Sequence, residues 1–236
     1  MKVYFYFFCV FLCLISIHCS SDEKPINNGI LPPRQLKILA LGDSYTIGQG
    51  VCDKCKFPEQ LKDSLLTKLP AQSIIELQVI AQTGWTTSNL KSAIASQNPN
   101  NNFDLVTLLI GVNNQFQNRP FSLYETEFPE LLNTATSLAK GNKNRVIVVS
   151  IPDYAFTPFG QSSPNPATIS LQIDQYNNFA KAHCQSNNVT FVDITDITRL
   201  GLLQPNLVAS DQLHPSSLAY SKFVQRLLPF SMVKIN

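Results

Sequence analysis

The chain has 236 residues, of which 44% are hydrophobic and 14% are charged, and its formal net charge is +2. This length and composition are typical of one globular domain with ample core, and no internal repeat or low-complexity tract is visible. Lysine and arginine are scattered and form no basic stripe, so we expect no nucleic-acid partner.

The N-terminal segment is typical of an export signal. Residues 3–17 form a weakly polar to apolar run that is short for a membrane span of ~20 residues, which favours a signal peptide over residues 1–18. Cys19 is followed by small and acidic residues and resembles the lipidated first residue of a bacterial lipoprotein. His18 departs from that pattern, so ordinary cleavage that releases a soluble protein is the alternative.

The sequence therefore predicts an exported protein of the bacterial cell envelope, anchored to the membrane through a lipid on Cys19. Residues 19–34 contain Ser, Asn, Gly and Pro, and we expect them to form a flexible tether before a folded domain at 35–236.

The remaining cysteines are consistent with export. Oxidising conditions favour a disulfide between Cys52 and Cys55, which lie three positions apart in a polar loop. A redox-active pair is less favoured because no thioredoxin-like context surrounds it, and a zinc site would need a second ligand pair at suitable spacing. We expect no metal or other cofactor, and we expect Cys184 to be a buried free thiol.

Apolar runs alternate with helical patterns along the rest of the chain. In chain order, we expect a strand at 38–41, a helix at 58–69, a strand at 74–80, a helix at 86–95, a strand at 103–110, a helix at 122–140, a strand at 145–150, a helix at 169–180, a strand at 189–192 and a final helix after Pro215. This alternation predicts an α/β fold: a three-layer α/β/α sandwich around a mostly parallel sheet of five strands.

Two of these helices carry more detailed predictions. Ser122 followed by Glu125 predicts a capping box at the helix start, and Pro129 predicts a kink or a later start. In the last helix, Leu218, Phe223 and Leu227 are expected to face the core.

Ser44 lies just past the first strand, after Gly42, whose conformational freedom permits a sharp turn. A serine becomes a nucleophile only when a base takes its proton. After export two histidines remain, and we expect His183 to pack at a helix end. His214 precedes the last helix, and Asp211 can bind one of its ring nitrogens while the other faces the serine. Alone, this Asp-x-x-His spacing is a weak signal that a surface turn also produces.

Acyl transfer also needs donors for the developing oxyanion. Candidates are the backbone N–H groups of Ser44 and Gly84 and the side-chain amide of Asn113, which follow three different strands. Taken singly, Gly84 is better explained as a plain turn glycine and Asn113 as a loop-stabilising amide, and it is the combination of these residues at separate strand ends that favours a catalytic site.

Two further aspartates compete with Asp211 as the partner of His214. Asp153 and Asp193 also follow strands, but Asp193 is more typical of a loop or capping residue, and Asp153 of a pocket lining. Aromatic residues after the same strands are candidate pocket walls, although aromatics are common in cores. These are Trp85, Phe116, Tyr154 and Phe156.

Four segments resemble the sequence blocks of the GDSL, or SGNH, hydrolase family, in order: Gly42-Asp43-Ser44-Tyr45, Gly84, Gly111-Val112-Asn113 and Asp211-Gln212-Leu213-His214. The resemblance covers roughly residues 36–228. It implies a flavodoxin-like sandwich and esterase, lipase or carbohydrate-esterase activity without a metal.

Carried over to this sequence, the resemblance implies that Ser44 is the nucleophile and that His214 is the base, oriented by Asp211. Gly84 and Asn113 would join Ser44 in the oxyanion hole. The chain departs from the family pattern at Tyr45, where leucine is common, and at Asn114, where an acid is common. The second departure concerns only local loop geometry.

The leading hypothesis is a serine esterase that acts on a small-molecule, lipid or glycan ester. A carbohydrate O-deacetylase acting on surface glycans is the alternative enzyme. A non-catalytic glycan- or lipid-binding module is the alternative from another class, and the complete set of catalytic residue types argues against it.

Overall fold

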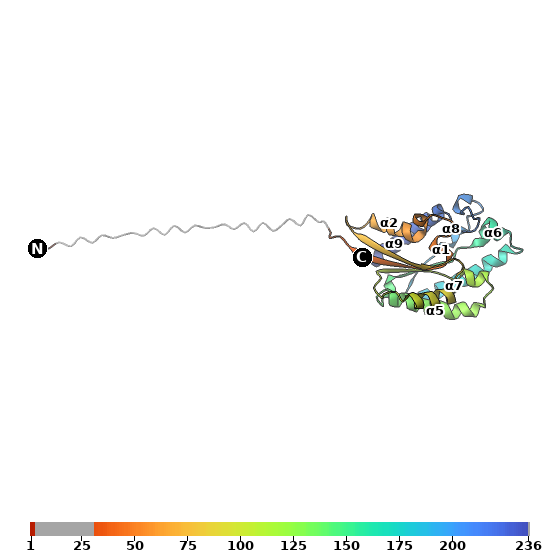
Figure 1. Ribbon diagram of the computed structural model, residues 1–236, viewed down its shortest axis with the longest axis horizontal. Coiled ribbons are helices and arrows are strands. Elements are labelled where there is room, and N and C mark those ends of the chain that lie inside the picture. Colours follow the sequence, from red (N-terminus) through yellow and green to blue (C-terminus); the bar gives the residue numbers. More distant parts are fainter. Residues whose placement is uncertain (3–30, 236) are drawn as a thin grey trace. The chain divides into compact units, whose positions relative to one another are not determined.

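The computed structural model describes residues 1–2 and 31–235, and residues from Pro32 onward form one compact unit (Figure 1). The predicted signal-peptide run and Cys19 lie outside the described residues, as does most of the expected tether. None of the helices in the described part of the chain is long and apolar enough to cross a membrane.

A five-stranded parallel sheet forms the centre of this unit. Its strands are β1 (Gln35–Gly42), β2 (Ile74–Ala81), β3 (Leu105–Leu109), β4 (Val146–Val149) and β5 (Thr190–Val192). Their spatial order is β2-β1-β3-β4-β5, and every neighbouring pair is parallel. The chain direction across the sheet reverses beside β1, and the crevice outside such a reversal is where α/β proteins bind ligands.

Helices cover both faces of the sheet, which confirms the predicted three-layer sandwich. Five long helices form the outer layers: α2 (Phe57–Leu66) and α9 (Ser217–Ile235) on one face, and α3 (Thr87–Gln97), α5 (Phe121–Leu138) and α7 (Pro166–Ser186) on the other (Figure 1). Shorter turns of helix follow strand ends or lie in loops: α1 (Ser44–Ile47), η1 (Asp53–Cys55), α4 (Val112–Phe116), η2 (Lys143–Arg145), η3 (Tyr154–Phe156), α6 (Pro158–Gln161), α8 (Thr195–Thr198) and η4 (Pro205–Leu207).

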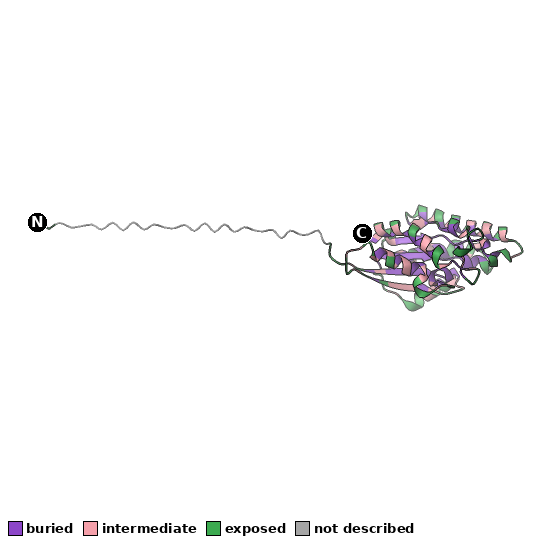
Figure 2. Cartoon of the chain, turned by 90° about the horizontal axis from the view of Figure 1, so that it is seen from above, coloured by how far each residue is buried: buried purple, intermediate pink, exposed green. Residues whose placement is uncertain are grey.

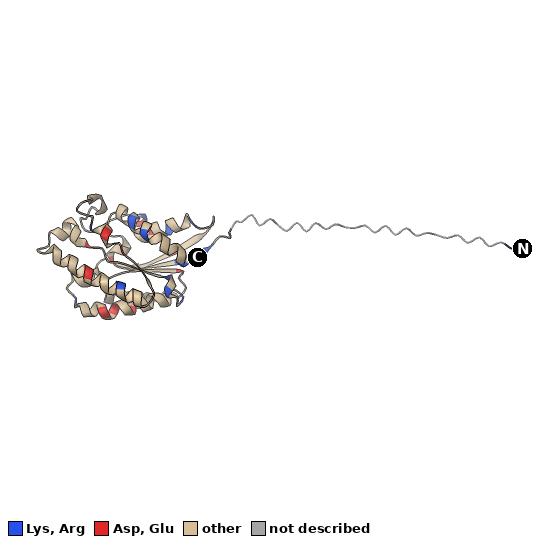
Figure 3. Cartoon of the chain, turned by 180° about the vertical axis from the view of Figure 1, so that it is seen from behind, with Lys and Arg blue, Asp and Glu red and all other residues tan. Residues whose placement is uncertain are grey.

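The core lies between the sheet and the two helical layers. Every residue of β3 and β4 is buried, as expected for strands with helices on both faces (Figure 2). Acidic and basic residues are both scattered along the ribbon of the outer helices and near the ends of the strands (Figure 3).

The start of α5 differs from the prediction. The helix begins at Phe121, with Pro120 as the capping residue, and no side chain caps it. Ser122 therefore lies inside the first turn, so the predicted capping box is wrong. The helix also continues through Pro129 without a later start.

The orientation of α9 corrects a second prediction. Leu218 is 43% exposed, whereas Tyr220, Phe223 and Leu227 are fully buried. At about 100° per residue, two positions along a helix lie on nearly opposite faces. Because Tyr220 faces the core, Leu218 must face solvent.

Candidate active site

Ser44 is the first residue of α1, directly after the turn that ends β1. Asp43 caps this helix, because its Oδ1 accepts a hydrogen bond from the backbone N–H of Tyr45 at 3.0 Å. The cap holds Ser44 at the start of the helix, where its own backbone N–H has no intrahelical acceptor. The sequence patterns above did not identify Asp43, although an aspartate just before a first helical residue is a typical cap signal.

Gly42 is required here for a different reason than expected. Its backbone is not in the left-handed region. A Cβ at this position would lie 2.2 Å from Thr46 Oγ1 and 2.4 Å from the Leu109 carbonyl oxygen. Glycine therefore lets the turn pack directly against the end of β3.

His214 is buried and paired with Asp211. Its Nδ1 lies 2.7 Å from Asp211 Oδ2, while Asp211 Oδ1 accepts the backbone N–H groups of Leu213 and His214, each at 3.0 Å. Burial acts to raise the pKa of the Asp211 carboxyl, but the hydrogen bonds from His214 and Leu213 outweigh it, so that this pKa lies below its ordinary value. The carboxylate thus stays ionised and leaves Nε2 as the ring nitrogen that can accept a proton.

The loop after β2 presents Gly84 to the same region. Gly84 has a φ of +83°, and no atom lies within 4 Å of where a Cβ would be. Its carbonyl is held by Gln117 Nε2 at 2.9 Å. The left-handed backbone favours glycine, and the open space beside it allows a ligand to approach the backbone.

Asn113 follows β3, as its place in the sequence indicates. Its Nδ2 donates to the Trp85 carbonyl at 3.0 Å. An amide NH₂ has two donors, so this bond orients the group and leaves the second N–H for a ligand.

The neighbouring Asn114 has a structural role. Its side chain is fully buried, accepts the Thr87 N–H at 2.9 Å and donates to Thr87 Oγ1 at 2.7 Å. It therefore links the start of α4 to the start of α3.

These groups meet in one cleft of about 180 Å³. The cleft is lined by Ser44, Tyr45, Thr83, Gly84, Val112, Asn113, Phe116, Tyr154, Leu213 and His214. Tyr45 also packs the edge of its ring against His214, with ring centroids 5.6 Å apart. Residues that follow four different strands, β1 to β4, and two residues of the loop before α9 thus converge on one small space.

Of the aromatic residues predicted to wall the pocket, Phe116 and Tyr154 line the cleft and the other two do not. Trp85 contributes its backbone carbonyl to Asn113, and Phe156 lies beneath the Arg199 guanidinium, 6.0 Å from it. The hydroxyl of Tyr154 donates to Gln115 Oε1 at 2.9 Å, which fixes the ring at the cleft wall.

The two rival aspartates bind other partners. Asp153 is fully buried and lines not this cleft but a smaller cavity that also includes Tyr154 and His214. It accepts hydrogen bonds from Arg199 Nε at 2.9 Å and from Ser170. Asp193 Oδ1 accepts from Ser150 Oγ at 3.0 Å and from the Thr195 N–H at 2.9 Å. Among the described aspartates, Asp211 is the one that bonds to the His214 ring.

The remaining predicted positions do not line the cleft. Cys52 and Cys55 form a disulfide, and Cys184 is a buried free thiol. His183 lies near the end of α7 and stacks on Phe179, with centroids 6.1 Å apart. No group of three or more His, Cys, Asp or Glu side chains that could hold a metal occurs among the described residues.

Comparison with known proteins identifies the class of protein that this fold and cleft define. Residues 40–222 match the profile of the GDSL-like lipase/acylhydrolase family, and the chain therefore belongs to this family of ester-bond hydrolases. Comparison with curated protein sequences finds no significant match.

Several solved structures share the fold. An acetyl xylan esterase from Geobacillus stearothermophilus is 20% identical, with a TM-score of 0.60 over 84% of this chain and 95% of that one. A lipolytic protein of the G-D-S-L family from Veillonella parvula is 17% identical, with a TM-score of 0.60 over 82% and 96%. A lipase/acylhydrolase from Enterococcus faecalis is 19% identical, with a TM-score of 0.60 over 84% and 95%.

Proposed function

We propose that this protein is a serine esterase in which Ser44 is the nucleophile, His214 the general base and Asp211 the residue that orients the base. The observation that carries the proposal is the 2.7 Å contact between His214 Nδ1 and Asp211 Oδ2, in a histidine that shares a cleft with Ser44. Membership of a family of acylhydrolases supports it.

In the first step, Ser44 Oγ attacks the ester carbonyl carbon while His214 Nε2 takes the hydroxyl proton. The Asp211 carboxylate stabilises the imidazolium that forms. Negative charge develops on the former carbonyl oxygen, and the backbone N–H groups of Ser44 and Gly84 and the Asn113 amide donate to it.

Collapse of this intermediate releases the alcohol, which receives its proton from His214, and leaves the acyl group on Ser44. A water molecule then gives a proton to His214 and attacks the acyl carbon. The bond between that carbon and Ser44 Oγ breaks, His214 returns the proton to Oγ, and the carboxylic acid leaves. Each step uses the same base and the same oxyanion donors, as in other serine hydrolases.

The size of the cleft favours a short acyl group. Its volume of about 180 Å³ lies below the ~300–1,000 Å³ of sites that enclose drug-sized ligands. Its apolar walls, Val112, Phe116 and Leu213, suit an acetyl or similar group. The same observation favours O-deacetylation of glycans as a second candidate, and one structural neighbour is an acetyl xylan esterase.

We further propose that the protein is exported and held at the bacterial cell envelope by a lipid on Cys19. The support is the signal-like run at residues 3–17, which ends just before Cys19 and the small residues that follow.

A fluorophosphonate probe and a matched pair of esters, p-nitrophenyl acetate and p-nitrophenyl octanoate, test the catalytic proposal. The probe should label the wild type at Ser44 and leave Ser44→Ala unlabelled. Ser44→Ala and His214→Ala should each lower kcat by about 10³-fold or more, and the double variant should lose little more because the two residues act as a unit. The acetate should be the better substrate.

A folded wild type that reacts with no such probe and hydrolyses neither ester would contradict the proposal and favour a binding module. Faster turnover of the octanoate would contradict the short-acyl preference alone. Release of acetate from an acetylated xylan, compared with the p-nitrophenyl esters, separates a glycan deacetylase from a general esterase.

A further inference from the structure

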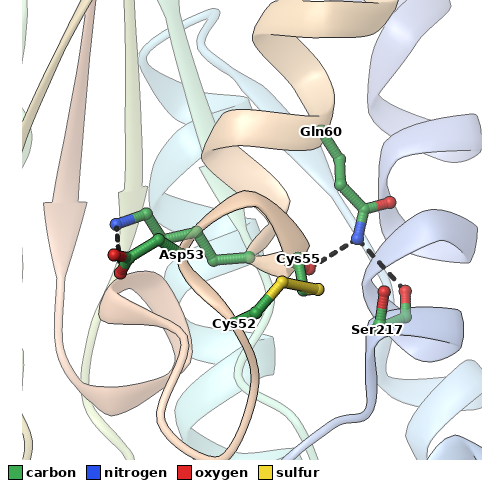
Figure 4. Close-up of a disulfide and its surroundings, with 6 residues drawn as sticks. Cys52, Asp53, Cys55, Gln60 and Ser217 are labelled. Carbon is green, nitrogen blue, oxygen red and sulfur yellow. Dashed lines mark hydrogen bonds and ion pairs between the residues drawn. A yellow bond between two sulfur atoms is a disulfide. The ribbon is translucent and has the colours of Figure 1, made fainter.

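The loop between α1 and α2 contains the disulfide and lies beside the active site. This disulfide loop, residues 48–56, includes the Cys52–Cys55 bond, which closes around η1 (Figure 4). Cys52 is exposed, so thiol reagents in solution can reach the bond.

Gly50 packs the disulfide loop directly against the carboxylate that binds His214. A Cβ on Gly50 would lie 2.8 Å from Asp211 Oδ2 and 3.1 Å from Ala209 Cβ. Oδ2 is the oxygen that contacts His214 Nδ1. Asp211 is otherwise exposed, so the Gly50 backbone shields this oxygen on one side from water that would compete for it.

The same loop is tied to the other catalytic segments. The Gln49 N–H donates to the Ser44 carbonyl at 3.0 Å, and Gln49 Oε1 accepts from Thr83 Oγ1 at 2.9 Å, next to Gly84. From α2, Gln60 Nε2 donates both to the Cys55 carbonyl and to the Ser217 carbonyl at the start of α9 (Figure 4). The disulfide loop thus contacts the nucleophile turn, the loop of Gly84 and the carboxylate of Asp211.

We propose that the disulfide loop positions Asp211 for catalysis and that reduction of Cys52–Cys55 lowers turnover by freeing Gly50 from the carboxylate. The inference rests on the proposed role of Asp211 as the partner of the catalytic base. It makes Gly50 a positioning residue and the disulfide a redox-sensitive support of the active site.

The physical reason is that the bond restricts the conformations of a short, glycine-containing loop. With the sulfurs joined, the backbone between Cys52 and Cys55 has few states, and residues 48–51 are held between this ring and α1. A dithiol reductant breaks the S–S bond, supplies two electrons and two protons to form two thiols, and is itself oxidised to a cyclic disulfide. The loop then gains conformational freedom, and its contact with Asp211 is made only part of the time.

Substitution of Gly50 tests the contact directly. Gly50→Ala places a methyl group against Asp211 Oδ2, and we expect kcat to fall roughly 10- to 100-fold, because small misplacements of catalytic groups have effects of that order. KM for p-nitrophenyl acetate should stay nearly unchanged, since the described lining of the cleft includes no residue of the disulfide loop.

Gly141→Ala is the matched control. Gly141 also has a positive φ, +69° against +85° at Gly50, but no atom lies within 4 Å of its Cβ position, and it follows the end of α5. It therefore reports the effect of backbone strain without contact to Asp211. We expect its kcat to equal that of the wild type.

Reduction tests the role of the bond. We expect wild-type kcat to fall roughly 3- to 10-fold after dithiothreitol treatment, in proportion to the alkylation of Cys52 and Cys55 read by mass spectrometry, and to recover on reoxidation. The double variant Cys52→Ser, Cys55→Ser should have the kcat of the reduced wild type, and dithiothreitol should not change it. If that variant does not fold, reduction of the folded wild type and the Gly50→Ala comparison still decide the question.

Full turnover by wild type whose Cys52 and Cys55 are verified as reduced, or equal losses in Gly50→Ala and Gly141→Ala, would overturn the inference while leaving the esterase proposal intact. An oxidised wild type with no ester hydrolysis and no probe labelling would instead remove the esterase proposal on which the inference rests.

Discussion

Asp43 holds the nucleophile turn with a carboxyl group that is fully removed from solvent. Its Oδ1 accepts the Tyr45 N–H, whereas Oδ2 is buried without a hydrogen-bond partner among the described residues. Burial raises the pKa of Asp43 from 3.8 to about 7, against the opposing effect of the bond from Tyr45. The folded protein therefore binds a proton at Asp43 more tightly than the unfolded chain does.

This raised pKa predicts how stability depends on pH. The stability that Asp43 contributes is fully present below pH 3.8 and is lost as the pH rises through about 7. Asp43→Asn keeps an acceptor for the Tyr45 N–H and stays neutral at every pH. We expect the free energy of unfolding of this variant to match that of the wild type near pH 4. At pH 8 it should be larger by about 2 kcal/mol, which is below the upper limit of ~4 kcal/mol for a pKa raised this far.

Thermal unfolding of both proteins at pH 4, 6 and 8 measures this difference. The gap in melting temperature should widen towards pH 8. A constant gap, or a wild type that is the more stable protein at pH 8, would show that Asp43 is ionised in the folded state without a penalty.

At the scale of elements, the three aspartates considered as partners of His214 differ in what they support. Asp193 binds at the start of α8, Asp153 joins the loop after β4 to Arg199, and Asp211 lies in the loop before α9 with His214. The groups that each aspartate binds therefore distinguish the partner of His214 from the two structural aspartates.

Replacing each of these aspartates by asparagine should therefore separate activity from stability. Asp211→Asn should lower kcat by roughly 10²- to 10⁴-fold, because the base loses its charged partner. Asp153→Asn should lower the free energy of unfolding by about 1–3 kcal/mol, because the ion pair between Arg199 and this buried carboxylate is lost. Its kcat should stay within a few-fold of the wild type. Asp193→Asn should change kcat little.

Steady-state kinetics and unfolding curves on the same three preparations provide the test. A larger loss of kcat in Asp193→Asn or Asp153→Asn than in Asp211→Asn would reassign the partner of His214.

Elements also show where local sequence patterns fail. The start of α5 has the residues of a capping box, yet the helix begins one residue before Ser122 with Pro120 as its cap. In α9, Leu218 is apolar but exposed, because Tyr220 and Phe223 take the inward face. Both errors have the same cause. The packing of the whole helix against the sheet decides where the helix begins and which side faces the core, and this packing overrides the local preference of a few residues near the helix start.

At the scale of the whole molecule, the order β2-β1-β3-β4-β5 brings the catalytic segments together. Ser44 follows β1, and the two strands that flank β1 lead to Gly84 and Asn113. Parallel strands have their carboxyl ends at one edge, so all three groups meet at the position where the sheet direction reverses.

The proposed lipid anchor concerns the molecule as a whole, because it would place the esterase at a membrane surface. We expect labelled palmitate fed to expressing bacteria to mark the wild type and not Cys19→Ala. Cys184→Ala is the control and should keep the label, because Cys184 is a buried thiol of the folded unit. Equal labelling of Cys19→Ala and wild type, or no labelling in a host that processes lipoproteins, would contradict the anchor.

The sequence by itself determined the alternation of strands and helices, the family and the strand ends at which Ser44, Gly84 and Asn113 lie. These features depend on local periodicity and on residues close together in the chain, so they can be predicted without a fold. Asp211 and His214 are also close in sequence, and their pairing could be anticipated from their spacing.

Only the tertiary structure decided which strands are neighbours, that Trp85 and Asp153 lie outside the cleft, and that Gly50 packs against Asp211. Each of these depends on contacts between residues that are far apart in the chain. Such contacts are set by how the helical layers and loops pack on the sheet, and no pattern of neighbouring residues specifies that packing.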